Sequence, residues 1–382
     1  MSKQICFILD WYPTKSNNGC VFAKHLIYAI ADKGFDCVVI APRIKNSQNE
    51  KVPYKREETT DSGSTVRIFT PAYYHFSSRK QTIRLSMNSH FKAVMKTIKK
   101  ENLNPDAVYG HFIYQCGLTA ARAGEKLGIP SYCACGENST RFAQGGQPYS
   151  TGLQYAGWKD ILSRLSGVIC VSSHNAELIV KNGFVPSEMK TGVFPNGFNG
   201  KKFFSFDKSK ARRELGFPDD KFIVAFTGDF SERKGIDKLS HALKSFDDVY
   251  SVFLGSGEIK PDCDNILFCG SVPNDEVVKY LNAADVFVLP TKGEGCCNAI
   301  VEALACGLPV ISSDLPFNDD ILDNTNSIRV DVSDVSQIEN AVNKLKTDES
   351  LLHKLSKGAA DSAKNLNINV RAENILKFME LN

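Results

Sequence analysis

Short apolar runs alternate with segments of helical periodicity along the first half of this chain. The runs have the length of strands, and between them apolar residues recur every three or four positions. The predicted strands are 4–9, 37–40, 107–109, 131–134 and 167–171, and the predicted helices are 19–33, 118–127 and about 158–165. Strands joined by single helices predict a parallel, doubly wound sheet.

The pattern breaks at the turn sequence FPNG (194–197) and then starts again. Strands are predicted at 222–227, 251–254, 286–289 and 309–312, and helices at 236–245, 275–283 and 298–306. We therefore expect an α/β protein of two Rossmann-like domains, 1–196 and 197–382, that face a central cleft. Ligands of such sheets bind outside the carboxyl ends of the strands. A last predicted helix, at about 369–381, packs either on the second domain or back on the first.

Length and composition agree with this division. The chain has 382 residues, enough for two to three domains, and 42% of them are hydrophobic, which argues against disorder. No apolar run reaches the roughly 18–20 residues of a membrane span, and the apolar run at 5–9 is too short for a signal-peptide core. Twelve cysteines without an export signal predict a cytoplasmic protein with mostly free thiols.

The charge is nearly balanced but unevenly distributed. A net charge of +3 makes bulk attraction to nucleic acid unlikely as a function. The segment 77–100 holds seven basic residues and no acid, and its apolar positions Ile83, Met87, Phe91, Val94 and Ile98 fall on one helical face. This helix either turns a solvated basic side to water, or docks on an anionic membrane or acceptor at the inner membrane face.

The segment 290–310, PTKGEGCCNAIVEALACGLPV, carries the most chemical information. A glycine loop leads into a helix that we expect to begin at Asn298, a good N-cap residue. The free backbone amides of Cys297, Asn298 and Ala299 would then bind phosphate.

Two glutamates flank the start of this helix. Glu294 precedes it and Glu302 lies within it among apolar residues, where an unpaired acid is costly unless it has a function. The two carboxylates could address two parts of one extended ligand. The alternative is an ordinary loop acid and an ordinary helix-surface glutamate.

The spacing Glu-x7-Glu within EGCCNAIVEALACGLPV resembles the signature of glycosyltransferase family 4, retaining enzymes of the GT-B fold, in the branch that reads EG-x-x-N before the helix. Further segments match that family in order and spacing, over about the whole chain. They are SNNGCVFAKHLIYAIADKGFDCVVIAP (16–42), VSSHNAELIVKNG (171–183), FPNGFN (194–199), FTGDFSERKGID (226–237), FLGSGE (253–258), ILFCGSVPNDEV (266–277) and LNAADVFVLPT (281–291).

The resemblance implies that the second domain binds a nucleotide sugar. Glu302 would hold the ribose hydroxyls, and Glu294 would face the donor sugar near the reacting face. Lys234, with Arg233 beside it, would stabilise the departing diphosphate. The remaining donor-binding positions would be Gly19, the backbone near Val272, and the amides of Cys297, Asn298 and Ala299. Taken alone, Lys234 would be interpreted as an exposed lysine at a helix start.

The sequence departs from the family at two positions. Asp229 follows Gly228 where relatives commonly carry arginine, and Cys135 stands where many have histidine. Glu137 and Asn138 are then expected on the acceptor side. His111 follows a strand end and is either a further acceptor-side candidate or a packed histidine.

The resemblance implies a metal-independent hexosyltransferase that retains anomeric configuration, without a cofactor. The donor is expected to be a UDP-sugar, and the acceptor a hydroxyl of a saccharide or lipid-linked saccharide in cell-surface polysaccharide synthesis. The seven histidines show no metal-ligand spacing, and no residue is an obvious covalent nucleophile. Two rivals stay open: a GT-B sugar-nucleotide epimerase, and a catalytically decayed nucleotide-sugar-binding scaffold.

Overall fold

The computed structural model describes residues 2–14, 19–45, 52–76, 82–137 and 157–381. Their contacts divide the chain into two compact units. Unit 1 comprises residues 1–194 and 369–382, and unit 2 comprises residues 195–368. The division lies two residues before the boundary expected from the sequence, and the last helix belongs to unit 1 rather than to a domain 197–382.

Unit 1 is built on an eight-stranded sheet in the order β10-β9-β8-β7-β1-β2-β5-β4. Its strands are β1 (Gln4–Ile8), β2 (Asp36–Ile40), β4 (Lys55–Thr59), β5 (Thr65–Phe69), β7 (Ala107–His111), β8 (Ser131–Cys135), β9 (Gly167–Cys170) and β10 (Thr191–Val193), and a separate pair joins β3 (Arg43–Ile44) to β6 (Ala72–Tyr73). Its helices are α1 (Val21–Ala31), α2 (Ile83–Lys100), the π-helical turn η1 (Ile113–Gly117), α3 (Leu118–Leu127), α6 (Trp158–Leu162), α7 (Ser173–Lys181) and α14 (Ile368–Phe378).

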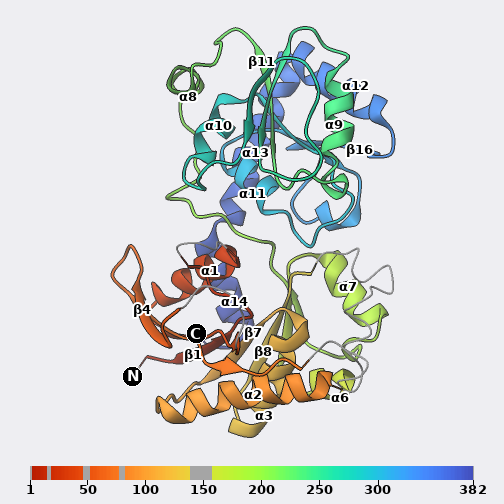
Figure 1. The fold of residues 1–382 in the computed structure, drawn as a ribbon. Coiled ribbons are helices and arrows are strands. Elements are labelled where there is room, and N and C mark those ends of the chain that lie inside the picture. The colour runs from red at the N-terminus through yellow and green to blue at the C-terminus, as the bar shows by residue number, and fades with distance from the viewer. Residues whose placement is uncertain (1, 15–18, 46–51, 77–81, 138–156, 382) are drawn as a thin grey trace. The chain divides into compact units, whose positions relative to one another are not determined.

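The pairing in this sheet is parallel apart from β4 and β5, which form an antiparallel hairpin. The sequence did not predict this hairpin, because β4 reads KREET and lacks the apolar alternation of a half-buried strand. Helices α2 and α3 pack together on the sheet (Figure 1).

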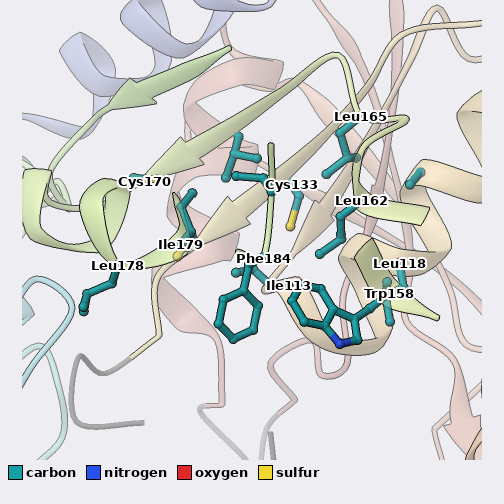
Figure 2. Close-up of a cluster of buried hydrophobic side chains, with 14 of the residues drawn as sticks. Ile113, Leu118, Cys133, Trp158, Leu162, Leu165, Cys170, Leu178, Ile179 and Phe184 are labelled. Carbon is teal, nitrogen blue, oxygen red and sulfur yellow. The ribbon is translucent and has the colours of Figure 1, made fainter. Parts of the chain in front are cut away.

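Two sets of buried side chains hold unit 1 together. One lies under α2 and α3 and includes Val94, Ile98 and Val108. The other gathers side chains of β8, β9, α6 and α7, and Figure 2 shows the rings of Trp158 and Phe184 side by side within it, with centroids 4.8 Å apart. All twelve cysteines are free thiols, and eleven of them are buried or partly buried.

The C-terminal end of helix α14 makes hydrogen bonds and ring contacts to the rest of unit 1. The hydroxyl of Tyr132 donates to the carbonyl of Met379 at 2.9 Å, and Nζ of Lys190 donates to the carbonyl of Phe378 at 2.9 Å. The ring of Phe378 meets the rings of Tyr132 and Phe194 edge-on. Periodicity predicted the helix, but only these tertiary contacts assign it to a unit.

Unit 2 is built on six parallel strands in the order β13-β12-β11-β14-β15-β16. They are β11 (Phe222–Thr227), β12 (Val249–Leu254), β13 (Ile266–Gly270), β14 (Val286–Leu289), β15 (Val310–Ser313) and β16 (Ser327–Val330). The helices are α8 (Lys208–Leu215), η2 (Glu232–Lys234), α9 (Ile236–Leu243), α10 (Val277–Ala283), α11 (Asn298–Ala305), η3 (Pro316–Asn318), α12 (Val335–Thr347), α13 (Glu349–Ala363) and η4 (Lys364–Leu366). The doubly wound order places the carboxyl ends of all six strands at one edge.

Candidate functional site

Close backbone packing fixes the loops at the carboxyl ends of β11 and β12. The amide of Gly228 donates to the carbonyl of Leu254 at 2.9 Å, and the amide of Phe230 donates to that of Ser256 at 2.9 Å. Gly255 has a φ of 149°, and a Cβ there would lie 1.9 Å from the carbonyl oxygen of Gly228. Only glycine allows this approach, which holds the two loops as one platform.

A second close approach joins the 3₁₀ turn η2 to the end of β14. Gly235, at φ 71°, ends this turn, and a Cβ there would lie 2.2 Å from the carbonyl oxygen of Pro290. The amide of Lys292 also donates to the carbonyl of Arg233 at 2.8 Å. The cation-bearing turn and the glycine loop before α11 are therefore positioned against each other.

Between these loops, one carboxylate oxygen of Glu294 forms ion pairs with two cations. Oε1 of Glu294 lies 2.7 Å from Nη1 of Arg233 and 2.8 Å from Nζ of Lys234. The Thr291 hydroxyl donates to the same oxygen at 2.9 Å. The Lys234 and Glu294 side chains are only 10% and 13% exposed, so their charges act through a medium that screens poorly.

The two cations of this cluster share one carboxylate oxygen. The described residues offer no donor to Oε2 of Glu294, which leaves that oxygen available to a hydroxyl of a ligand. Thr291 was missed from the sequence. Its place at the end of β14, three residues before Glu294, is the signal that could have found it.

Lys234 is protonated in this setting. Burial by itself lowers the pKa of the ammonium, but the neighbouring Cys297 and Glu294 outweigh burial and raise it. Nζ also lies 3.8 Å from Sγ of Cys297. A buried, charged lysine with one strong partner can still donate to an anionic ligand.

Helix α11 starts where it was predicted, but its N-cap differs from the prediction by one residue. Asn298 is the first helical residue, and Cys297 is the N-cap, with no capping hydrogen bond from its side chain. The expectation that Asn298 caps the helix is therefore wrong, because Cys297 already has the extended backbone of a cap. The amides of Asn298 and Ala299 remain at a helix start without a capping oxygen, as phosphate binding requires.

Glu302 lies on the second turn of α11, with its side chain partly exposed. Burial raises the pKa of its carboxyl to about 7, and the positive charge of Lys202 opposes that rise. None of the described residues donates a hydrogen bond to it. A carboxylate with unfilled acceptor capacity suits a ligand that carries hydroxyl groups.

The other expected positions of unit 2 lie at the same edge. Asp229 is exposed, and its Oδ2 lies 3.8 Å from Nη2 of Arg233, so its charge partly offsets that cation. Val272 follows β13 and is partly exposed.

The site residues expected in unit 1 lie in different surroundings, some exposed to solvent and some buried. Gly19 is exposed in the turn before α1. His111 ends β7 among the rings of Tyr109, Phe112 and Phe22, and burial, followed by the charge of Arg371, lowers its pKa to about 3. It is therefore a neutral, packed histidine.

Glu137 is buried and has a structural contact of its own. Its Oε1 accepts the amide hydrogen of Ile113 at 2.7 Å, and Nδ2 of Asn175 donates to its carbonyl at 2.9 Å. Cys135 is fully buried at the end of β8. Asn138 lies outside the described residues.

Each of the two units matches a known protein family over most of its length. Residues 21–201 match the family described as Glycosyltransferase Family 4, and residues 207–362 match the one described as Glycosyl transferases group 1. The chain is 30% identical over 322 residues to a Bacillus subtilis protein, TuaC, whose name assigns it provisionally as a glycosyltransferase of teichuronic acid biosynthesis. The match covers 82% of this chain and 81% of that protein. This chain belongs to glycosyltransferase family 4.

Other similarities extend the comparison. This family 4 protein is 26% identical to an Escherichia coli UDP-Gal:α-D-GlcNAc-diphosphoundecaprenol α-1,3-galactosyltransferase, over 74% of this chain and 76% of that one. Its fold matches sucrose-phosphate synthase of Thermosynechococcus elongatus with a TM-score of 0.80 at 19% identity, each chain covered to 98%. The fold also matches Anabaena HepE in complex with UDP-glucose, with a TM-score of 0.72 at 17% identity over 99% of both chains. The GT-B fold expected from the sequence is confirmed.

If Glu302 binds the donor ribose as a carboxylate, affinity for a UDP-sugar falls as pH falls through about 7. Protonation at a pKa of about 7 removes acceptor capacity, so the dissociation constant rises about tenfold between pH 8 and pH 6. Calorimetry at several pH values measures this. Glu302→Gln should bind more weakly with a flat profile, and a wild-type profile that is already flat would contradict the assignment.

Proposed function

We propose that this protein is a retaining glycosyltransferase that moves a hexosyl group from a UDP-sugar to a hydroxyl of a saccharide or lipid-linked saccharide, in cell-surface polysaccharide synthesis. The buried cluster of Glu294, Arg233 and Lys234 beside the start of α11 carries the proposal. Related enzymes named for teichuronic acid synthesis and for a diphosphoundecaprenol acceptor support the class of product and acceptor.

In this mechanism the bond between the anomeric carbon and the diphosphate oxygen breaks, and its electron pair stays on the leaving diphosphate. Lys234 and Arg233 stabilise the negative charge that grows there, together with the amides at the start of α11. Glu294 offers Oε2 to the donor sugar, and Glu302 holds the ribose hydroxyls. The amide of Cys297 and the backbone at Gly19 and Val272 complete the donor contacts.

Of the three acceptor-side residues expected in unit 1, His111 and Glu137 are buried and already have packing or hydrogen-bond contacts. Asn138 is therefore the one kept here as the residue that presents the acceptor. The hydroxyl oxygen of the acceptor attacks the anomeric carbon from the face that the diphosphate leaves, and its proton passes to the departing phosphate oxygen. Retention follows from attack on the same face, without a covalent enzyme intermediate. Because two cationic side chains serve the diphosphate, the transfer needs no metal in this proposal.

Sugar transfer is tested by incubating the protein with a UDP-sugar, with and without a lipid-linked saccharide. We expect UDP to be released and a glycosylated product to form when acceptor is present. Conversion of the sugar nucleotide without acceptor would identify an epimerase instead. Binding without turnover, across a panel of acceptors, would favour a scaffold.

We also propose that the protein works at the inner face of the cytoplasmic membrane, as a peripheral protein. None of the described helices is both long and apolar enough to cross a membrane. Helix α2 buries Ile83, Met87, Val94 and Ile98, as its periodicity predicted, and turns its basic residues to solvent. Leu85 of α2 is half exposed, as are Tyr74 and Phe76 next to the helix, which suits an interfacial surface.

Anionic vesicles should therefore bind this protein in a salt-dependent manner, and neutral vesicles should not. Each lysine near an anionic surface contributes about 1 kcal/mol, so changing Lys92, Lys96 and Lys99 to Gln should weaken binding on the order of 100-fold. The matched control changes the exposed Lys344, Lys354 and Lys357 of unit 2. Equal losses in both triple variants, or no vesicle binding, would leave α2 as a solvated basic face.

A further inference from the structure

Three residues far apart in the sequence meet inside unit 1, at a site separate from the donor-binding cluster of unit 2. Asp10 follows β1, His90 lies in α2 and Cys116 lies in η1. One ligand-type atom from each residue lies within 4.8 Å of those of the other two. We propose that Asp10, His90 and Cys116 form a site for one thiophilic divalent cation, of which Zn²⁺ is the best match.

The histidine shows most clearly that this cluster points to a ligand. His90 is fully buried, and its Nδ1 lies 2.9 Å from the hydroxyl of Thr119, which fixes the ring. Its Nε2 is buried and has no hydrogen-bond partner among the described residues. A buried ring nitrogen without a partner is costly, whereas a metal ion would use its lone pair while Thr119 orients the ring.

The other two groups supply the matching chemistry. Sγ of Cys116 donates to Oδ1 of Asp10 at 3.1 Å, so the thiol and the carboxylate already face each other. Sulfur, imidazole nitrogen and carboxylate oxygen together favour zinc over the hard cations magnesium and calcium. On binding, the metal replaces the thiol proton, which leaves to solvent, and the two anionic ligands balance the dication.

The geometry needs only small shifts. Zinc–ligand bonds of about 2.0–2.3 Å place the ligands of a tetrahedral site about 3.3–3.7 Å apart. Atoms at the present limit of 4.8 Å would move about 1.1–1.5 Å closer, and Sγ of Cys116 and Oδ1 of Asp10, now 3.1 Å apart, would separate slightly. The backbone that presents Cys116 is unusual, since Gln115 has φ 60° and ψ −62°. Nε2 of Gln115 holds this turn by donating to the hydroxyl of Tyr73, whose ring meets His90 edge-on.

A bound ion would tie together the loop after β1, α2 and η1. Asp10 is partly exposed, so a fourth position can be filled by water. The role inferred is structural, and it does not rest on the proposed transferase activity. No sequence pattern predicts the site, because the residues have no ligand spacing and meet only through the packing of α2 on the sheet.

Metal-stripped full-length protein, titrated with Zn²⁺ against a chromophoric chelator, tests the proposal. We expect one tightly bound zinc per chain and a raised melting temperature. Cys116→Ser and His90→Asn, which keeps a polar atom for Thr119, should each weaken zinc binding at least about tenfold. The exposed Cys269→Ser and His241→Gln are matched controls and should bind zinc as the wild type does.

Cobalt substitution in the wild-type protein gives an answer even if a variant fails to fold. Co²⁺ bound through Cys116 should produce a thiolate-to-metal absorption band at one equivalent. A failure to bind zinc at one ion per chain, a cobalt spectrum without that band, or equal loss in the control variants would overturn the proposal.

Discussion

Replacing Lys234 by alanine should lower kcat by about 10- to 150-fold, with a much smaller change in KM for the donor. One charge-assisted hydrogen bond in a desolvated site contributes about 1.5–3 kcal/mol, and here that bond strengthens as the diphosphate departs. The Lys234 side chain is 10% exposed and its Nζ lies 2.8 Å from Oε1 of Glu294, so no water-exposed charge can easily replace it. Steady-state kinetics with a saturating acceptor measures the effect.

The neighbouring exposed ion pair provides the control for this variant. Lys292 lies on the same loop and pairs with Glu232 at 2.5 Å, but its side chain is 40% exposed. Lys292→Ala should leave kcat within about twofold, since exposed pairs contribute little. Arg233 still pairs with Glu294 in Lys234→Ala, so the loop should keep its fold. An unchanged kcat in Lys234→Ala would remove this lysine from the mechanism.

Replacing Glu294 by glutamine should separate catalysis from product affinity. The amide keeps the shape and an acceptor for Thr291, but it leaves the charges of Arg233 and Lys234 without their shared counterion. With less negative charge beside these cations, the variant should bind UDP several-fold more tightly. Turnover should fall at least about tenfold, because the carboxylate that we propose to face the donor sugar is lost and product leaves slowly.

Competition by UDP and steady-state turnover, measured on the same preparation, check this pattern. Glu232→Gln is the matched control, because it removes an exposed carboxylate from the same region. Weaker UDP binding together with lost turnover would mean that Glu294 holds the loop in place and does not act on the sugar. Full turnover in Glu294→Gln would exclude it from the reaction.

Sequence patterns predicted the fold well where local periodicity determines the structure. The predicted strands 222–227 and 286–289 match β11 and β14, because continuous apolar runs of that length are buried on both faces of a parallel sheet. The polar hairpin strand β4 lacked such a run. The unit to which α14 belongs depends on Phe378 and its ring contacts, which no local pattern reports.

For the candidate site, the sequence indicated which residues to consider but not which contacts they make with one another. The family resemblance predicted Glu294 and Lys234 as site residues. The contact between Oε1 of Glu294 and Nζ of Lys234 depends on the close approach of Gly235 to Pro290. The spacing of residues along the sequence does not predict such a contact between distant segments. The N-cap was misplaced by one residue, because asparagine favours that position while the backbone of Cys297 adopts it.

We infer that unit 2 holds a nucleotide sugar, and titration calorimetry with UDP-, GDP- and ADP-sugars measures this binding. We predict that one UDP-sugar binds with one site per chain, and that Glu302→Ala weakens it. At about 100 times its dissociation constant, that ligand should also add about 2.7 kcal/mol to the free energy of unfolding. If no nucleotide sugar in the panel binds, or if Glu302→Ala leaves the affinity unchanged, then unit 2 does not hold a nucleotide sugar in the way proposed.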